Sequence, residues 1–237
     1  MEKIWGASRA GGEGEGAHWL TVSDLMAGLM MVFLFIAVAL MRNAFLERDK
    51  IKEIAVTYQA NQVALYEALV DEFSIDLERW DAQIARDTLA FEFKSPDVLF
   101  GIGETNIRPH FKEILSDFFP RYLRVLRGYR DSIGEIRIEG HTSSIWNNQT
   151  SETEAYFLNM NLSQGRTQSV LRYVHDLPGV GSERQWGKRN FAAVGFSSSR
   201  LVLNEAGQED TEASRRVSFR VITNAEIQIR RIIEESW

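Results

Sequence analysis

The feature that most constrains this chain is an apolar stretch near its N-terminus, residues 20–41. Its 22 residues contain a single charged side chain, Asp24. As an α-helix the stretch would be about 33 Å long, enough to cross a hydrocarbon core of roughly 30 Å. Trp19 and Arg42 flank it, and both side chains suit a membrane interface. The polar lead-in is long and no small-residue cleavage site follows, so we predict a permanent transmembrane helix over residues 19–42 rather than a signal peptide.

Asp24 has two interpretations. As a cap at the membrane interface, it would accept hydrogen bonds from free backbone N–H groups of the first helical turn. As a desolvated carboxylate inside the membrane, it would take up and release a proton, or bind sodium, and face a partner helix or a water path. Ala27 and Gly28 lie on the same helical face, where small residues let a partner helix approach closely. The residues leave both interpretations open, and the second requires a membrane partner.

Charge and cysteine content exclude several classes of function. The net charge of -6 argues against a nucleic-acid partner, which usually needs a basic face. The chain has no cysteine, so it forms neither disulfides nor thiolate metal sites. The sequence offers no histidine–carboxylate cluster at metal-ligand spacing and no nucleophile–base pair. We therefore expect no metal, no cofactor and no enzymatic activity.

Hydrophobic periodicity divides the chain into four parts: a flexible glycine-rich tail over residues 1–18, the span, a helical linker over 43–87, and a compact domain over 88–237. The linker lacks proline and glycine, and we expect a long amphipathic helix over 44–86. In the domain we expect strands over 88–93, 135–142, 190–196 and 215–223, and helices over 108–126, 162–177 and 225–236. Pro120 is expected to kink or divide the first of these helices. We predict an α+β fold, in which helices cover one face of a mixed sheet.

Four sequence blocks in the second half of the chain carry a family resemblance. They read IEGHTSS, NMNLSQGRTQSVLRYV, AVGFSSSRLV and SRRVSFRV. Their order resembles that of the OmpA-like peptidoglycan-binding domain over about residues 88–223. A span with an aspartate in SDLMAGLMM, placed ahead of such a domain, resembles the MotB-type B subunits of ion-driven rotary motors. The HTSS and LSQGRT variants and the short chain are more similar to MotB-like subunits of anti-phage defence systems than to flagellar MotB.

The resemblance implies a B-type subunit of a proton-driven inner-membrane motor, with Asp24 as the ion-carrying carboxylate. Two copies would form a homodimer within a ring of five A-type membrane subunits. The N-terminus would be cytoplasmic, the C-terminal domain would bind peptidoglycan in the periplasm, and cytoplasmic defence effectors would act through the complex. The charge pattern favours the opposite orientation, because four basic residues follow the span within 42–52 and two precede it. The alternatives are a passive tether between membrane and cell wall, or a flagellar-type stator subunit.

The resemblance also implies which residues bind peptidoglycan: Thr142, Ser143, Asn159, Leu162 and Arg166. Ser143 replaces the family aspartate that, together with the helix arginine, holds the diaminopimelate of the stem peptide. A serine can accept a hydrogen bond from an ammonium but cannot neutralise it, so this half of the recognition is expected to be weaker. Asn159 has an alternative role in stabilising the loop, and Leu162 an alternative role in the core.

Arg166 also suggests a binding site on physical grounds. With Ser163 as a helix cap, Arg166 would lie in the first helical turn, where free N–H groups and the guanidinium together bind a carboxylate. The alternative is a surface salt bridge. His141 is expected to be a structural residue at a strand end. Trp146 has two open interpretations, as part of a sugar or peptide surface or as an ordinary loop residue.

Overall fold

The structure, a computed structural model, describes residues 13–94, 96–224, 226–227, 230 and 234. It divides into two compact units, Met1–Glu53 and Ile54–Trp237. Residues 1–12 of the predicted flexible tail lie outside the described part of the chain. So does most of the predicted last helix over 225–236.

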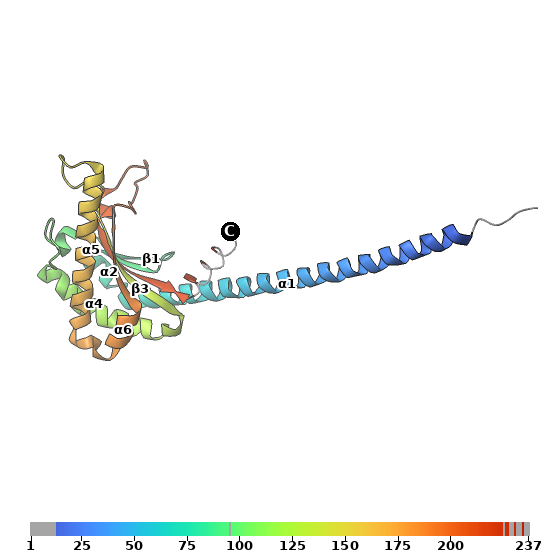
Figure 1. Cartoon of the computed structure of the whole chain (residues 1–237). Coiled ribbons are helices and arrows are strands. Elements are labelled where there is room, and N and C mark those ends of the chain that lie inside the picture. Colours follow the sequence, from blue (N-terminus) through green and yellow to red (C-terminus); the bar gives the residue numbers. More distant parts are fainter. Residues whose placement is uncertain (1–12, 95, 225, 228–229, 231–233, 235–237) are drawn as a thin grey trace, which may run out of the picture. The chain divides into compact units, whose positions relative to one another are not determined.

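The first unit consists of the N-terminal part of helix α1, Glu13–Phe73 (Figure 1). This helix contains a stretch long and apolar enough to cross a membrane, with a mean hydropathy of 2.4. None of that stretch is buried inside the structure. A helix whose apolar side chains are exposed on all sides is suited to lipid or to partner helices rather than to water.

The predicted helix over 44–86 ends earlier than expected, at Phe73. A short helix, α2 (Asp76–Arg79), and a strand, β1 (Ala82–Ala85), follow it. The chain turns with positive φ angles at Asp81 (46°) and Leu89 (51°), which glycine or asparagine would normally occupy. The loop between the two strands contains neither glycine nor proline, so the sequence pattern did not reveal the hairpin.

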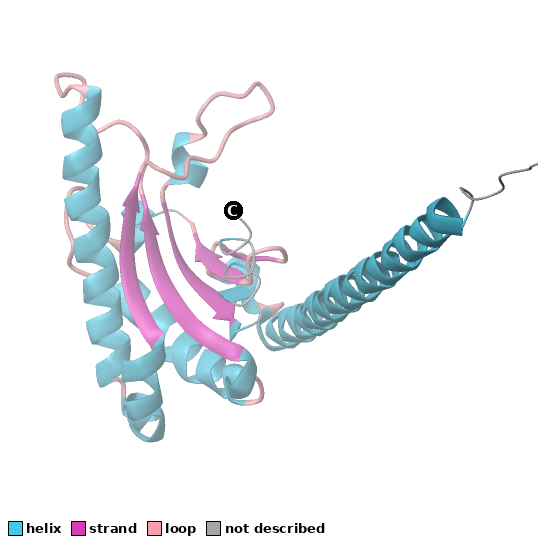
Figure 2. Ribbon diagram, turned by 45° about the vertical axis from the view of Figure 1, so that its right-hand side comes forward, coloured by secondary structure: helices cyan, strands magenta, loops and turns pink. Residues whose placement is uncertain are grey.

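The second unit is built on a five-stranded sheet with the order β1-β2-β5-β3-β4. The other strands are β2 (Ala90–Phe93), β3 (Ile133–His141), β4 (Phe191–Ser197) and β5 (Arg216–Thr223). Strands β3 and β4 are parallel, and the other pairs are antiparallel, so the sheet is mixed. Helices α4 (Pro109–Arg127) and α5 (Glu152–Asp176) pack against one face (Figure 2). The predicted α+β architecture is confirmed.

Short elements connect these layers. They are α3 (Pro96–Leu99), η1 (Arg130–Ser132), η2 (Pro178–Glu183), α6 (Arg184–Asn190) and α7 (Thr211–Ser214). Helix α4 is continuous through Pro120, so the expected division does not occur. The neighbours Phe118, Phe119 and Tyr122 are fully or almost fully buried, and their packing offsets the backbone hydrogen bond that the proline lacks.

An aromatic cluster forms the centre of the core between the sheet and α4. Phe91 and Phe118 have ring centroids 4.5 Å apart, and Phe93 and Phe118 are 5.1 Å apart in an edge-to-face arrangement. The C-terminal part of α1 contributes Phe73, whose ring lies 5.2 Å from that of Phe91. Aromatic pairs in these geometries add to the free energy gained by burial. The last turns of α1 therefore belong to the folded domain.

Helix α5 lies unusually close to the sheet because glycines face it. A Cβ atom at Gly195 of β4 would lie 2.5 Å from the backbone N of Gln164, and one at Gly140 of β3 would lie 2.8 Å from the carbonyl O of Ser163. The Gln164 side chain also pairs with the free edge of β4. It donates to the carbonyl O of Ala193 (3.2 Å) and accepts from the N–H of Gly195 (2.8 Å). This contact fixes α5, and the residues it carries, against the end of the sheet.

Replacing Gly195 by alanine is expected to lower the free energy of unfolding by about 1–3 kcal/mol, because the new methyl group meets backbone atoms that cannot rotate away. The measurement is the urea midpoint of the full chain in detergent, followed by tryptophan fluorescence. Gly181→Ala is the matched control, since a Cβ there meets no atom within 4 Å. Equal midpoints for the two variants would show that α5 can move away from the sheet without cost.

Candidate functional site

The five residues implied to bind peptidoglycan line one pocket of about 270 Å³. We call it the Arg166 pocket. Thr142 and Ser143 follow the end of β3, while Asn159, Leu162 and Arg166 lie on successive turns of α5. Spacings of three and four residues place the three helical side chains on one face. Five further residues complete the lining: Ile102, Gly103, Ile145, Trp146 and Arg215.

Arg166 is anchored to the loop that follows α3. Its side chain is buried, with the residue only 6% exposed. Nε donates to the carbonyl O of Glu104 (2.9 Å), and Nη2 donates to the carbonyl O of Gly101 (3.0 Å). The guanidinium lies 4.9 Å from the ring centroid of Phe100. Arg166 is therefore a buried residue that lines the pocket and also fixes the loop opposite, rather than an exposed surface side chain.

The predicted helix cap at Ser163 is also wrong. Helix α5 begins ten residues before Leu162, at Glu152, and Ser151 caps it by accepting from the N–H of Glu154 (3.3 Å). Ser163 is buried in mid-helix, where its Oγ donates to the carbonyl O of Met160 and accepts from the N–H of Ser197. Since Arg166 is not in a first turn, no free helix N–H groups assist it. Its guanidinium must carry any carboxylate recognition from this helix.

Asn159 and Leu162 both line the pocket, and both also contribute to the packing or hydrogen bonding of the domain. Asn159 is 3% exposed, and its Nδ2 donates to the carbonyl O of Ser143 (3.1 Å). This bond holds the loop after β3 in place, as the alternative interpretation expected. Leu162 is half-buried. Both residues also line the pocket, so a structural role for either residue is compatible with a role in ligand binding.

The loop after β3 contains one buried hydroxyl group, Thr142 Oγ1, that has no hydrogen-bond partner among the described residues. Ser143 Oγ donates to the carbonyl O of Ile145 at 3.4 Å, which is long for such a bond. Buried hydroxyl groups are normally satisfied, so an unpaired one on a pocket wall favours a bound polar group.

A carboxylate from a distant loop fixes the same segment. Glu209 accepts from the backbone N–H of Ser144 (2.9 Å) and, at short distance, from its Oγ. The family aspartate is missing at Ser143, and among the described residues that line the Arg166 pocket none is acidic. Arg215, the first arginine of the SRRV block, is a second cation on the lining and was not among the predicted site residues.

His141 ends β3 on the opposite face of the sheet from Gly140, consistent with a structural residue. Its ring stacks on Phe196, with centroids 5.3 Å apart, and its Nε2 lies 3.5 Å from Glu139 Oε2. Burial lowers the pKa of His141 below its ordinary value; hydrogen bonding to Glu139 opposes this, and the positive charges of Arg216 and Arg200 reinforce it. The imidazole is therefore neutral in the folded protein near neutral pH.

This histidine makes stability depend on pH. A lowered pKa means that the unfolded chain binds the proton more readily, so stability is lost as the pH falls below the ordinary histidine value. Between about pH 7.5 and about pH 5.5, the free energy of unfolding is expected to fall by up to about 1 kcal/mol. Urea midpoints at both pH values test this. His141→Gln should remove most of the difference, while the same substitution at the exposed His110 should preserve it.

Asp24 lies inside α1, eleven residues after the first helical residue, Glu13. This is about three turns from the helix start, so the capping interpretation is wrong. The side chain is exposed, as are Ala27 and Gly28 on the same face. A Cβ at Gly28 would meet no atom within 4 Å. The helical face that carries the Asp24 carboxylate therefore has room for a partner helix beside Ala27 and Gly28.

Comparison with known proteins gives one relative along nearly the whole chain. No family model matches. The chain is 54% identical over 235 residues to Zorya protein ZorB from Escherichia coli strain Crooks, which covers 99% of this chain and 100% of that protein. Among solved structures, a MotB-like protein from Desulfovibrio vulgaris is 21% identical, with a TM-score of 0.49, over 72% of this chain and 94% of that chain. The cell wall anchor of the T6SS from Pseudomonas aeruginosa is 23% identical, with a TM-score of 0.45, over 66% and 97%.

Proposed function

Because the chain belongs to the family of Zorya protein ZorB, we propose that it is the B-type subunit of a proton-driven motor in the bacterial inner membrane. Residues 19–42 span the membrane, with the N-terminus in the cytoplasm. The C-terminal domain lies in the periplasm and holds peptidoglycan, so that the motor works against a fixed point. The motor serves anti-phage defence and acts on cytoplasmic effectors. Two copies of the chain stand within a ring of five A-type subunits.

The observation that carries the anchoring role is the Arg166 pocket itself. Five residues from two separate sequence blocks, chosen by family resemblance, meet on the wall of one cavity. Its charged lining residues are Arg166 and Arg215. Such a lining favours a carboxylate of a stem peptide, because guanidinium groups bind carboxylates through charge-assisted hydrogen bonds. The Thr142 hydroxyl, which has no partner within the described part of the chain, would supply a further contact.

The ion-carrying role rests on Asp24 and its open face. A carboxylate inside an apolar helix is costly while it is charged, and protonation removes that cost. In the proposed cycle, Asp24 takes a proton at the interface with an A-type subunit. Once it is neutral, Asp24 is no longer held in a polar environment, so the transmembrane helices of the two copies shift relative to the ring of A-type subunits. Release of the proton on the other side of the membrane returns the helices to their starting position. Gly28 and Ala27 allow the ring helix to approach the carboxylate closely.

Restoring the family aspartate tests the anchoring role by a gain of function. Ser143→Asp places a carboxylate on a wall that is otherwise cationic or neutral, so it should neutralise the ammonium of diaminopimelate. The affinity for diaminopimelate-containing stem peptide is expected to rise about tenfold, the effect of one charge-assisted hydrogen bond. Calorimetry with the full chain in detergent measures it.

The matched control is Ser144→Asp, one residue along, where the new charge meets the carboxylate of Glu209. It should leave affinity unchanged or reduce it. An equal gain from both variants would mean that the effect is non-specific, and no gain from Ser143→Asp would mean that the ammonium is not held at this wall.

A further inference from the structure

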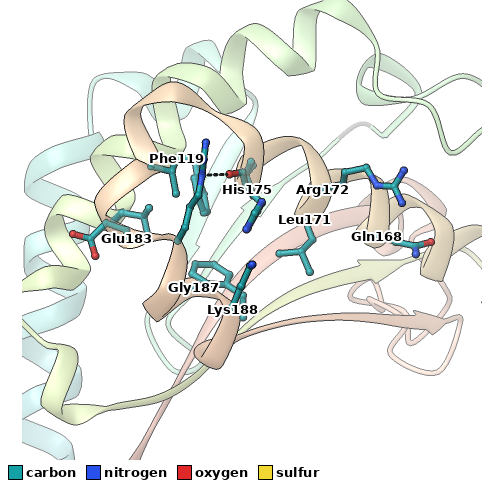
Figure 3. A pocket seen from close by; sticks show the side chains of 13 residues that line it. Phe119, Gln168, Leu171, Arg172, His175, Glu183, Gly187 and Lys188 are labelled. Carbon is teal, nitrogen blue, oxygen red and sulfur yellow. Dashed lines mark hydrogen bonds between the residues drawn. The ribbon is translucent and has the colours of Figure 1, made fainter.

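A second cavity lies in the same unit, on a later stretch of α5 and on elements that do not line the Arg166 pocket. It has a volume of about 400 Å³ and is lined by residues of α4, α5, η2, α6 and the first residue of β4 (Figure 3). We call it the α4–α6 pocket. It shares no lining residue with the Arg166 pocket. Its volume falls within the range of small-molecule sites.

The floor of this pocket is apolar. Six side chains from four elements form it: Phe119, Leu123, Leu171, Val174, Val180 and Phe191. Four of the six are at least nine-tenths buried. Such a floor binds a hydrocarbon chain or ring through burial of apolar surface, at about 25 cal/mol for each Å² removed from water.

The rim of the pocket is cationic. Arg172, Arg184 and Lys188 are exposed at its edge. Arg172 and Lys188 form no hydrogen bond or ion pair with any other described residue, and Arg184 donates through Nε to the carbonyl O of His175 (3.2 Å). In Figure 3 the Lys188 and His175 side chains point toward one another across the cavity. Positive charge is therefore concentrated where a ligand would leave the apolar floor.

The acidic residue on the lining does not cancel this charge. Glu183 is buried and is already paired with Arg127 (3.1 Å) and with Arg130 at short distance. His175 adds a polar atom that needs a partner, because its Nε2 is buried and accepts or donates no hydrogen bond within the described residues. An anionic oxygen placed between His175 and Lys188 would satisfy this nitrogen and the lysine together.

We propose that the α4–α6 pocket binds a single-chain anionic amphiphile, with its hydrocarbon part on the apolar floor and its carboxylate at the cationic rim. A neutral chain would leave the rim cations unpaired, and a short hydrophilic anion would leave the floor exposed to water. A small amphiphile is also favoured over a peptide strand from a partner protein, because backbone groups at the neighbouring edge of β4 are already paired with Gln164. The proposal does not depend on the peptidoglycan or proton roles.

Photo-cross-linking tests the proposal with the full chain in zwitterionic lipid nanodiscs. The probe is a medium-chain fatty acid with a diazirine near its apolar end. Cross-links should map to the floor residues Leu123, Leu171 and Val180. The fatty alcohol of the same length should label them about tenfold less, because it lacks the charge-assisted contact. Equal labelling by acid and alcohol would overturn the proposal, as would labelling confined to the transmembrane helix.

Two variants sharpen the test. Lys188→Glu should reduce labelling of the floor about tenfold, while Arg189→Glu, an equal change of charge at the next exposed residue, which does not line the pocket, should reduce it far less. Leu171→Trp fills the cavity and should abolish labelling while the rim stays intact. If the floor is labelled in the isolated chain but not when an A-type subunit is co-expressed, the pocket is instead a protein interface and the proposal is wrong.

Discussion

Replacing Asp24 by asparagine is expected to abolish motor-dependent function while the protein stays folded and bound to the cell wall. Asparagine has nearly the same shape and keeps hydrogen-bonding groups, but it cannot take up and release a proton. Protection against phage should fall to the level of a strain that lacks the protein. Proton uptake by liposomes that contain the chain and the proposed A-type subunit should fall to that of empty liposomes.

The same substitution separates the motor from a passive tether. A tether needs only the span and the wall-binding domain, and asparagine preserves both. Even if Asp24 bound backbone groups, asparagine would replace it well, since the two residues are nearly equivalent as helix caps. Ser23→Ala is the matched control beside it and should leave protection intact. Full protection by the Asp24→Asn variant would rule out the ion-carrying role and leave the tether.

The domain architecture could be predicted because its elements carry strong local signals. Alternation in 135–142 and 215–223 predicted the central strands β3 and β5, and helix α4 lies within one residue of the expected range 108–126 at both ends. The start of α5 was missed because the apolar residues in its first turns run together over 155–158 instead of recurring every three or four positions. What fixes that start is the hydroxyl of Ser151, a single local contact that pattern reasoning about apolar residues does not weigh.

The pocket was only partly predictable for a related reason. The motif residues on α5 and after β3 were identified by their sequence blocks, and the structure brings all of them to one cavity. Its opposite wall comes from Ile102 and Gly103, in a loop without a recognisable motif. That loop is positioned by long-range hydrogen bonds that Arg166 donates to the carbonyl groups of Gly101 and Glu104. Contacts between residues more than sixty positions apart cannot be read from local periodicity.

Replacing Arg166 by alanine is expected to cost both stability and binding. The change leaves the carbonyl groups of Gly101 and Glu104 without their donors and removes the guanidinium from the ring of Phe100. The free energy of unfolding should fall by about 3 kcal/mol, and binding to purified peptidoglycan should be lost. Arg124→Ala on the exposed side of α4 is the matched control and should change neither property.

Loss of binding by this variant alone would not identify a ligand contact, because the loop opposite would move as well. Arg166→Lys keeps the charge but lacks the planar fork that reaches two carbonyl groups above an aromatic ring, so it should be intermediate in stability and still bind poorly. Thr142→Val provides the decisive comparison. Its hydroxyl has no partner among the described residues, so its removal should leave the urea midpoint unchanged or higher while peptidoglycan binding weakens several-fold. Both variants could instead bind peptidoglycan as tightly as the unmodified chain. The Arg166 pocket would then have only a structural role, and the peptidoglycan-binding site would lie elsewhere on the domain.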